Sequence, residues 1–214
     1  MKSWKVWLSL VLVLLIGAGG GFLWWDNFVR WRPHVITHSP LEITRALERA
    51  GWVSPGLPGP KLYMISFRDC PDCQRFEREI FPRLQAVGVD TRVIMVARPD
   101  AEGVSRSTPA ERTTVAELWA NRSWRLWQQW QAAAPQTWTA PGLIPADTDT
   151  GRAALVEAGR QMVTTLRPLL AENGVNFAYP LLVWQTRDGA LHACACESPR
   201  TYRYLLDELG VPPT

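Results

Sequence analysis

Two cysteines spaced by two residues are the part of this chain best suited to chemistry. Cys70 and Cys73 lie between an apolar run rich in strand-forming residues, 61–67, and a run with helical spacing of its apolar residues, 74–81. A C-x-x-C pair at the start of a helix meets unpaired backbone N–H groups and the partial positive charge of the helix terminus. Both stabilise a thiolate, which is the species that attacks a disulfide. The spacing therefore indicates a redox-active dithiol.

Two other roles are open to these cysteines. Together with Cys194 and Cys196, which are spaced C-x-C, they could form a four-cysteine zinc site. Against this, zinc-binding pairs usually occupy tight Gly-rich turns rather than the start of an amphipathic helix. A purely structural disulfide is the other role, but a loop of two residues removes little entropy from the unfolded chain. The redox interpretation is favoured, with Cys70 expected to be accessible and Cys73 shielded within the first helical turn.

The second cysteine pair lies in an expected hairpin. Asp188 and Gly189 separate two apolar runs, 180–186 and 190–196, which is a strong hairpin signal. Cys194 and Cys196 should point to the same face of the second strand, and the turn should bring Cys196 beside Pro180. We predict a second redox pair able to exchange with the first. The alternative is that both are small buried residues that fill the strand.

The N-terminal segment determines the expected compartment. The nineteen residues from Trp7 to Trp25 carry no charge, and as a helix they are about 28 Å long, close to the thickness of a bilayer core. Tryptophans mark both ends, and Lys2 and Lys5 precede the run. The pattern predicts a cytoplasmic N-terminus at 1–6 and a single transmembrane helix at 7–25, or else a cleaved signal sequence. Either exports the cysteines to an oxidising compartment.

The remaining chain divides into a spacer and one domain. Residues 26–60 are rich in proline, and a short helix at 41–51 is expected within them. The domain is expected at 61–214, with a second strand at 90–97, a helical insertion at about 99–175 and a last helix at 199–209. The formal net charge is +3, and no Lys/Arg run or Gly-rich phosphate loop occurs, so nucleic-acid binding is not expected. Trp124, Trp127 and Trp130 share a helix face, which is read as a packed core, the alternative being a client-binding surface.

The order of elements resembles the thioredoxin superfamily, and most closely the catalytic domain of the DsbC/DsbG group of periplasmic disulfide isomerases. Over residues 61–209, three segments carry the likeness: 67–73 with its C-x-x-C, 116–119, and Tyr179-Pro180. The resemblance implies an α/β thioredoxin-like fold with a helical insertion. It also implies that Cys70 attacks, Cys73 resolves, Pro180 is a cis-proline facing the dithiol and Tyr179 contacts substrate.

The resemblance implies a periplasmic thiol:disulfide oxidoreductase that needs no cofactor. The helix expected at 7–25 would anchor it in the inner membrane. Its expected partners are exported proteins that contain cysteine, a membrane redox partner and, through the N-terminal helix, the lipid bilayer. Three departures stand out. Residues 33–60 are too short for the dimerisation domain of those isomerases, and Cys194 and Cys196 are additional cysteines. Asp69 and Asp72 should also oppose thiolate formation, while Arg68 favours it. We therefore expect a milder oxidant than DsbA. The alternative is a non-enzymatic assembly component of a secretion or conjugation apparatus.

Overall fold

The computed structural model describes residues 2–213 and divides the chain into two units, the second of which starts at Pro33. The first unit contains the helix α1 (Lys2–Phe28), whose described side chains from Val11 to Leu23 are exposed. Among the described residues, no helix has the length and apolar character needed to cross a membrane. The segment 7–25 that was predicted to span the membrane lies within α1.

The second unit is built on a six-stranded sheet with the strand order β1-β6-β5-β3-β4-β2. Its strands are β1 (His34–Val35), β2 (Trp52–Val53), β3 (Lys61–Ser66), β4 (Asp90–Met95), β5 (Leu181–Gln185) and β6 (Leu191–Ala195). β3 lies near the centre, parallel to β4 and antiparallel to β5. After Lys61 every residue of β3 is buried, as expected for a strand covered on both faces.

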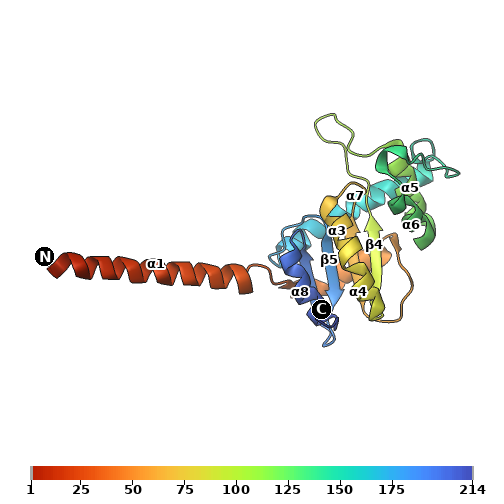
Figure 1. Ribbon diagram of the computed structural model, residues 1–214. Coiled ribbons are helices and arrows are strands. Elements are labelled where there is room, and N and C mark those ends of the chain that lie inside the picture. The colour runs from red at the N-terminus through yellow and green to blue at the C-terminus, as the bar shows by residue number, and fades with distance from the viewer. Residues whose placement is uncertain (1, 214) are drawn as a thin grey trace. The chain divides into compact units, whose positions relative to one another are not determined.

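Helices cover both faces of this sheet (Figure 1). On one face, Leu62 and Met64 pack in a core that includes residues of α3 (Pro71–Glu79), α4 (Phe81–Ala86) and α8 (Pro199–Glu208). On the other face, Tyr63 and Ile65 pack with residues of α2 (Pro40–Arg49) and α7 (Thr150–Ala171). Neighbouring residues of β3 enter different cores because successive side chains of a strand point to opposite faces.

The segment 33–60 is part of the folded domain, which differs from the expected spacer. Its short helix is present as α2, and it also supplies the two edge strands, β1 paired with β6 and β2 paired with β4. Ile43 and Leu47 of α2 are fully buried. The prolines thus bound short elements that gain their stability from packing on the sheet, and the domain begins near Pro33 rather than at Lys61.

The predicted helical insertion follows β4. It consists of α5 (Pro109–Asn121), α6 (Trp124–Ala132), two short 3-10 turns at Pro135–Thr137 and Ala146–Thr148, and α7. Thr108 and Glu111 form a reciprocal capping box at the start of α5. Trp127 and Trp130 are 6% and 1% exposed, so this helix face is core, as predicted.

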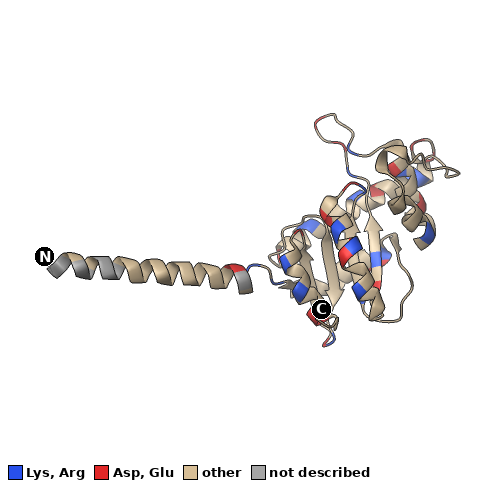
Figure 2. Ribbon diagram, viewed as in Figure 1, with Lys and Arg blue, Asp and Glu red and all other residues tan. Residues whose placement is uncertain are grey.

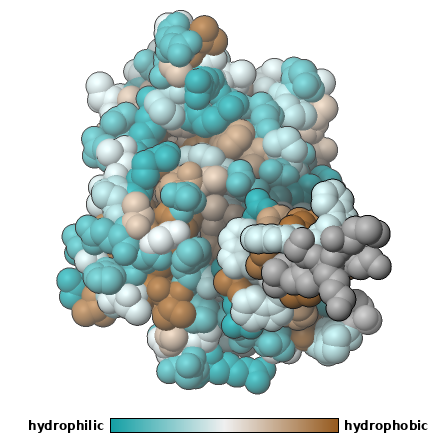
Figure 3. Space-filling model, turned by 90° about the vertical axis from the view of Figure 1, so that its left-hand side faces the viewer, coloured by the Kyte–Doolittle hydropathy of each residue, from teal (hydrophilic) through white to brown (hydrophobic). Residues whose placement is uncertain are grey.

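Charged residues of both signs are mixed over the second unit (Figure 2), in keeping with the small net charge. On the face shown in Figure 3, apolar residues lie in small groups among hydrophilic ones. In the view of Figure 2, the Lys and Arg residues of the second unit do not gather in one broad region, as a surface for nucleic acid would require.

Candidate redox site

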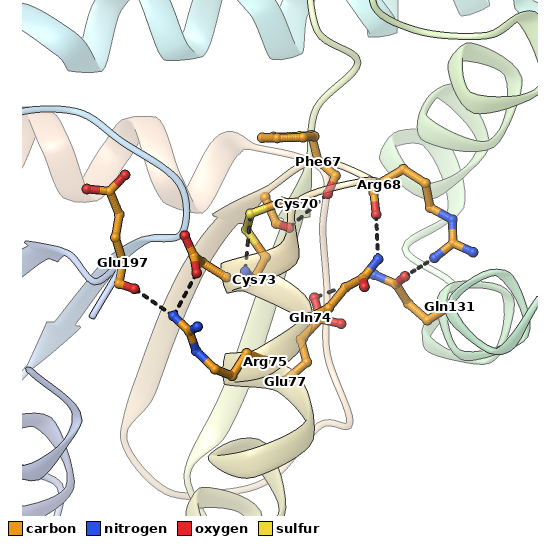
Figure 4. The surroundings of a disulfide bond; sticks show 11 residues. Phe67, Arg68, Cys70, Cys73, Gln74, Arg75, Glu77, Gln131 and Glu197 are labelled. Carbon is orange, nitrogen blue, oxygen red and sulfur yellow. Dashed lines mark hydrogen bonds and ion pairs between the residues drawn. A yellow bond between two sulfur atoms is a disulfide. The ribbon is translucent and has the colours of Figure 1, made fainter. Parts of the chain in front are cut away.

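Cys70 is the residue that caps helix α3. β3 ends at Ser66, and a short turn leads to Cys70, whose extended backbone (φ −84°, ψ 106°) places it at the N-cap position with Pro71 next. Proline suits this first helical position because its missing N–H would have no partner there. The backbone N–H of Cys73 donates a hydrogen bond of 3.2 Å to Cys70 Sγ (Figure 4). The helix terminus thus directs an N–H at the sulfur expected to attack, which favours its thiolate in the reduced form.

The two cysteines of the motif are joined in a disulfide, with their Cα atoms 5.2 Å apart. Cys70 is 2% exposed and Cys73 is 1% exposed. The disulfide-bonded form therefore shows no contrast in exposure between the two cysteines, and the greater accessibility of Cys70 stays a prediction for the reduced form. Cys70 Sγ is turned into the first helical turn, toward Cys73, whereas its neighbours Asp69 and Pro71 are exposed.

The end of the sheet beside this motif also holds Pro180. The Tyr179–Pro180 peptide bond is cis, as the resemblance implies. Ile65 pairs with Leu181, so Pro180 lies one residue further along the ladder, opposite Ser66. Tyr179 packs edge-on against Phe67, with 5.1 Å between the ring centroids. The segment before β5 therefore contacts the turn that leads from β3 to Cys70.

Arg68 ties the motif to the helical insertion. Its guanidinium donates to Gln131 Oε1 of α6 and to the carbonyl of Ala133, and it lies 5.4 Å from the centre of the Trp130 ring. Gln74 of α3 donates to the Arg68 carbonyl at 3.1 Å (Figure 4). Arg68 was expected to favour the thiolate of Cys70, but its guanidinium instead contacts residues of the helical insertion.

Asp72, the carboxylate inside the motif, forms an ion pair with Arg75. Nη2 of Arg75 lies 2.6 Å from Asp72 Oδ1 and 2.7 Å from the carbonyl oxygen of Glu197. Part of the negative charge of Asp72 is offset by this contact, which weakens its expected opposition to a thiolate at Cys70. Arg75 was not singled out from the sequence, because its partner Glu197 lies more than a hundred residues away.

Solved structures share this architecture at low sequence identity. BcfH from Salmonella enterica Typhimurium matches with a TM-score of 0.52 and 15% identity, over 98% of this chain and 93% of that chain. The chain has a thioredoxin-like fold. The catalytic domain of Proteus mirabilis ScsC (TM-score 0.49, 14% identity, 79% of this chain and 96% of that chain) and oxidised BdbD from Bacillus subtilis (TM-score 0.44, 15% identity, 77% and 92%) are also found. No model of a known protein family and no curated protein matches the chain.

Within this thioredoxin-like fold, the second cysteine pair is also joined. Cys194 and Cys196 form a disulfide with a Cα–Cα distance of 5.2 Å. They are 4% and 0% exposed, so both are buried. Within the described part of the chain, no group of three or more His, Cys, Asp or Glu residues could hold a metal ion. The four cysteines are joined within each pair, which differs from the arrangement of a four-cysteine zinc site.

A third acidic group near the motif is Glu77, one turn after Cys73 on α3. Burial raises the pKa of the Glu77 carboxyl to about 8, against the opposing effects of the cations Arg68 and Arg78. Although the residue keeps partial exposure, its carboxyl is enclosed beside Gln131, whose Nε2 lies 3.5 Å from Glu77 Oε1. Sequence reasoning did not find Glu77, because its neighbour Gln131 lies more than fifty residues later in the chain.

The raised pKa of Glu77 predicts a dependence of stability on pH. The protonated carboxyl is favoured by folding, so its contribution is complete below about pH 4.5 and is lost as the pH rises through about 8. Glu77→Gln should therefore leave the free energy of unfolding nearly unchanged at pH 5. At pH 9 it should raise that energy by about 1–2 kcal/mol, a value reduced from the full shift because the side chain is partly hydrated.

Urea unfolding followed by tryptophan fluorescence at both pH values measures this effect. Glu79→Gln is the matched control, because Glu79 is exposed on the same helix and should show no such difference between pH 5 and pH 9. Equal responses of the two variants would mean that the Glu77 carboxyl is hydrated.

Proposed function

We propose that the chain is a thiol:disulfide oxidoreductase that acts on exported proteins through Cys70 and Cys73. The observation that carries the proposal is the disulfide at the start of α3, with the Cys73 N–H directed at Cys70 Sγ, beside a cis-proline segment. A pair closing so small a loop constrains the unfolded chain little, which favours a redox role over a structural one.

The exchange proceeds through a mixed disulfide. In the reduced protein, the Cys70 thiolate attacks one sulfur of a client disulfide, and the other client sulfur leaves as a thiolate that takes up a proton. The Cys73 thiolate then attacks Cys70 Sγ, which restores the Cys70–Cys73 disulfide and releases the second client thiol. The client gains two electrons and two protons, and a separate redox partner must then reduce the motif again. The reverse sequence oxidises a client, and the supply of electrons from the partner sets the direction.

Tyr179 is the proposed substrate contact, together with the aromatic rings beside it. Phe67 and Phe177 flank Tyr179 at 5.1 and 5.3 Å between ring centroids. Two arginines lie over the outer rings, Arg98 at 4.2 Å from the Phe67 centroid and Arg167 at 4.8 Å from that of Phe177. This arrangement favours an extended client segment with apolar or acidic residues next to its cysteine.

The proposed location is the periplasm, with the N-terminal segment as anchor or as signal sequence. The support is the uncharged run from Trp7 to Trp25, preceded by Lys2 and Lys5. Fractionation of cells and N-terminal sequencing of the mature protein decide between the two. Retention of the protein in the soluble cytoplasm would contradict both.

Trapping of clients tests the proposed function. A Cys73→Ala variant lacks the resolving thiol, so mixed disulfides through Cys70 should accumulate in cells and appear as bands on non-reducing gels that dithiothreitol removes. The control is Cys70→Ala/Cys73→Ala, which should give none of these bands. Bands of equal intensity in both variants, or their absence from Cys73→Ala, would contradict attack by Cys70.

A further inference from the structure

Cys196 lies at the same end of the sheet as the redox motif. Its backbone N–H donates to the Pro180 carbonyl at 2.9 Å, which extends the β5–β6 ladder by one residue. Ser66, Pro180 and Cys196 therefore form one row across three neighbouring strands. Neighbouring strands lie about 5 Å apart, so the backbone of Cys196 is on the order of 10 Å from that of Ser66. Ser66 is the last residue of β3 and precedes Cys70 by four positions.

The second pair also lies on the same face as the motif. Cys194 and Cys196 belong to the core that holds Leu182 and Phe76 of α3, while the intervening Ala193 belongs to the core on the opposite face. The sulfur atoms of Cys194, in β6, and of Cys196, just after it, thus point to the side of the sheet on which α3 begins. Both disulfides therefore lie at the same end of the sheet and on the same face of it.

Arg75 connects the segments that carry the two pairs. Its Nη2 contacts Asp72, inside the C-x-x-C motif, and the carbonyl of Glu197, the residue that follows Cys196 (Figure 4). The first turn of α3 and the chain just after the second pair are therefore held within the reach of one guanidinium group.

The second disulfide is poorly suited to a purely structural role. It joins residues two apart in the chain, so it restricts the unfolded state even less than the motif disulfide does. Cys194 and Cys196 are also almost fully buried, at 4% and 0% exposure. A route through the neighbouring motif would give them access to electrons.

We propose that Cys194 and Cys196 form a second redox couple that exchanges two electrons with Cys70 and Cys73; this rests on the proposed function of the motif. The Cys70 thiolate attacks Cys196 Sγ, which breaks the Cys194–Cys196 bond and releases Cys194 as a thiolate that takes up a proton. The Cys73 thiolate then attacks Cys70 Sγ, which restores the motif disulfide and releases Cys196 as a thiol. The motif loses two electrons and the second pair gains them. The domain can thereby hold two electrons, as the reduced thiols of Cys194 and Cys196, close to the reactive motif.

The first test isolates one sulfur from each pair. Cys73→Ser/Cys194→Ser keeps Cys70 and Cys196, and oxidation with glutathione disulfide should produce an intramolecular Cys70–Cys196 bond, identified by peptide mapping. Cys73→Ser/Cys196→Ser is the matched control. It keeps Cys194, which pairs with Leu182 two residues further from the row, and its cross-link should be at least about tenfold less abundant. Equal yields, or no Cys70–Cys196 bond in a variant with the native circular dichroism spectrum, would overturn the proposal.

A second test keeps Cys194 and Cys196 and needs no cross-link. In the full chain, reduction of Cys194–Cys196 by a protein dithiol such as thioredoxin is followed by acid quenching, alkylation and mass spectrometry. In Cys70→Ser/Cys73→Ser this reduction should be at least about tenfold slower than in the natural sequence, since the route through the motif is missing. Equal rates would overturn the proposal. Neither test involves a client protein. If Cys73→Ala traps clients but the two reduction rates are equal, the proposed function stands and only the second redox couple is excluded.

Discussion

Replacement of Cys70 by serine is expected to lower the rate of catalysed disulfide exchange by at least about 10³-fold. A serine hydroxyl is not ionised at neutral pH, and the N–H of Cys73 that would stabilise a thiolate has no such anion to bind. The rate is measured as reduction of a disulfide-containing model protein, with dithiothreitol as electron donor.

Asp69→Asn is the control for this variant. It keeps both thiols and changes only the exposed charge next to Cys70, so it should alter the rate by no more than about threefold. Full activity of Cys70→Ser in cells would contradict the enzyme and would favour the alternative of a non-enzymatic assembly component.

Replacement of Trp130 by alanine is expected to lower the free energy of unfolding by about 3–5 kcal/mol. Trp130 is 1% exposed within the core that includes Trp127, and its ring also lies against the Arg68 guanidinium. The change therefore leaves a cavity and removes a contact that ties the insertion to the redox motif. Denaturant unfolding monitored by circular dichroism measures the loss.

The matched control is Gln129→Ala, the adjacent and exposed position of α6, where the change should stay within about 0.5 kcal/mol. A loss below about 1 kcal/mol for Trp130→Ala would indicate that this helix face is a free surface, as the client-binding alternative required.

Local sequence patterns were sufficient for much of this fold. The strand before Cys70, the helix after it and the hairpin at Asp188-Gly189 each depend on residues close together in the chain, and all three are present. The position of Cys196 beside Pro180 followed from counting outward from that turn. These features could be predicted because strand alternation and turn geometry fix the register.

The features that sequence reasoning missed depend on distant contacts. β1 and β2 have two residues each and are strands only through their pairing with β6 and β4, so the segment 33–60 carried no strand signal. The contacts of Arg68 and Glu77 with Gln131 both require helix α6, which the chain reaches much later.

A redox titration of the purified protein in glutathione buffers tests the central claim most directly. Alkylation and peptide mapping of Cys70 and Cys73 give the reduced fraction at each potential. A redox-active motif should titrate reversibly as a two-electron couple at a potential between about −270 and −120 mV, below that of the strong oxidant DsbA. A Cys70–Cys73 pair that stays oxidised below about −300 mV, as structural disulfides do, would contradict the account.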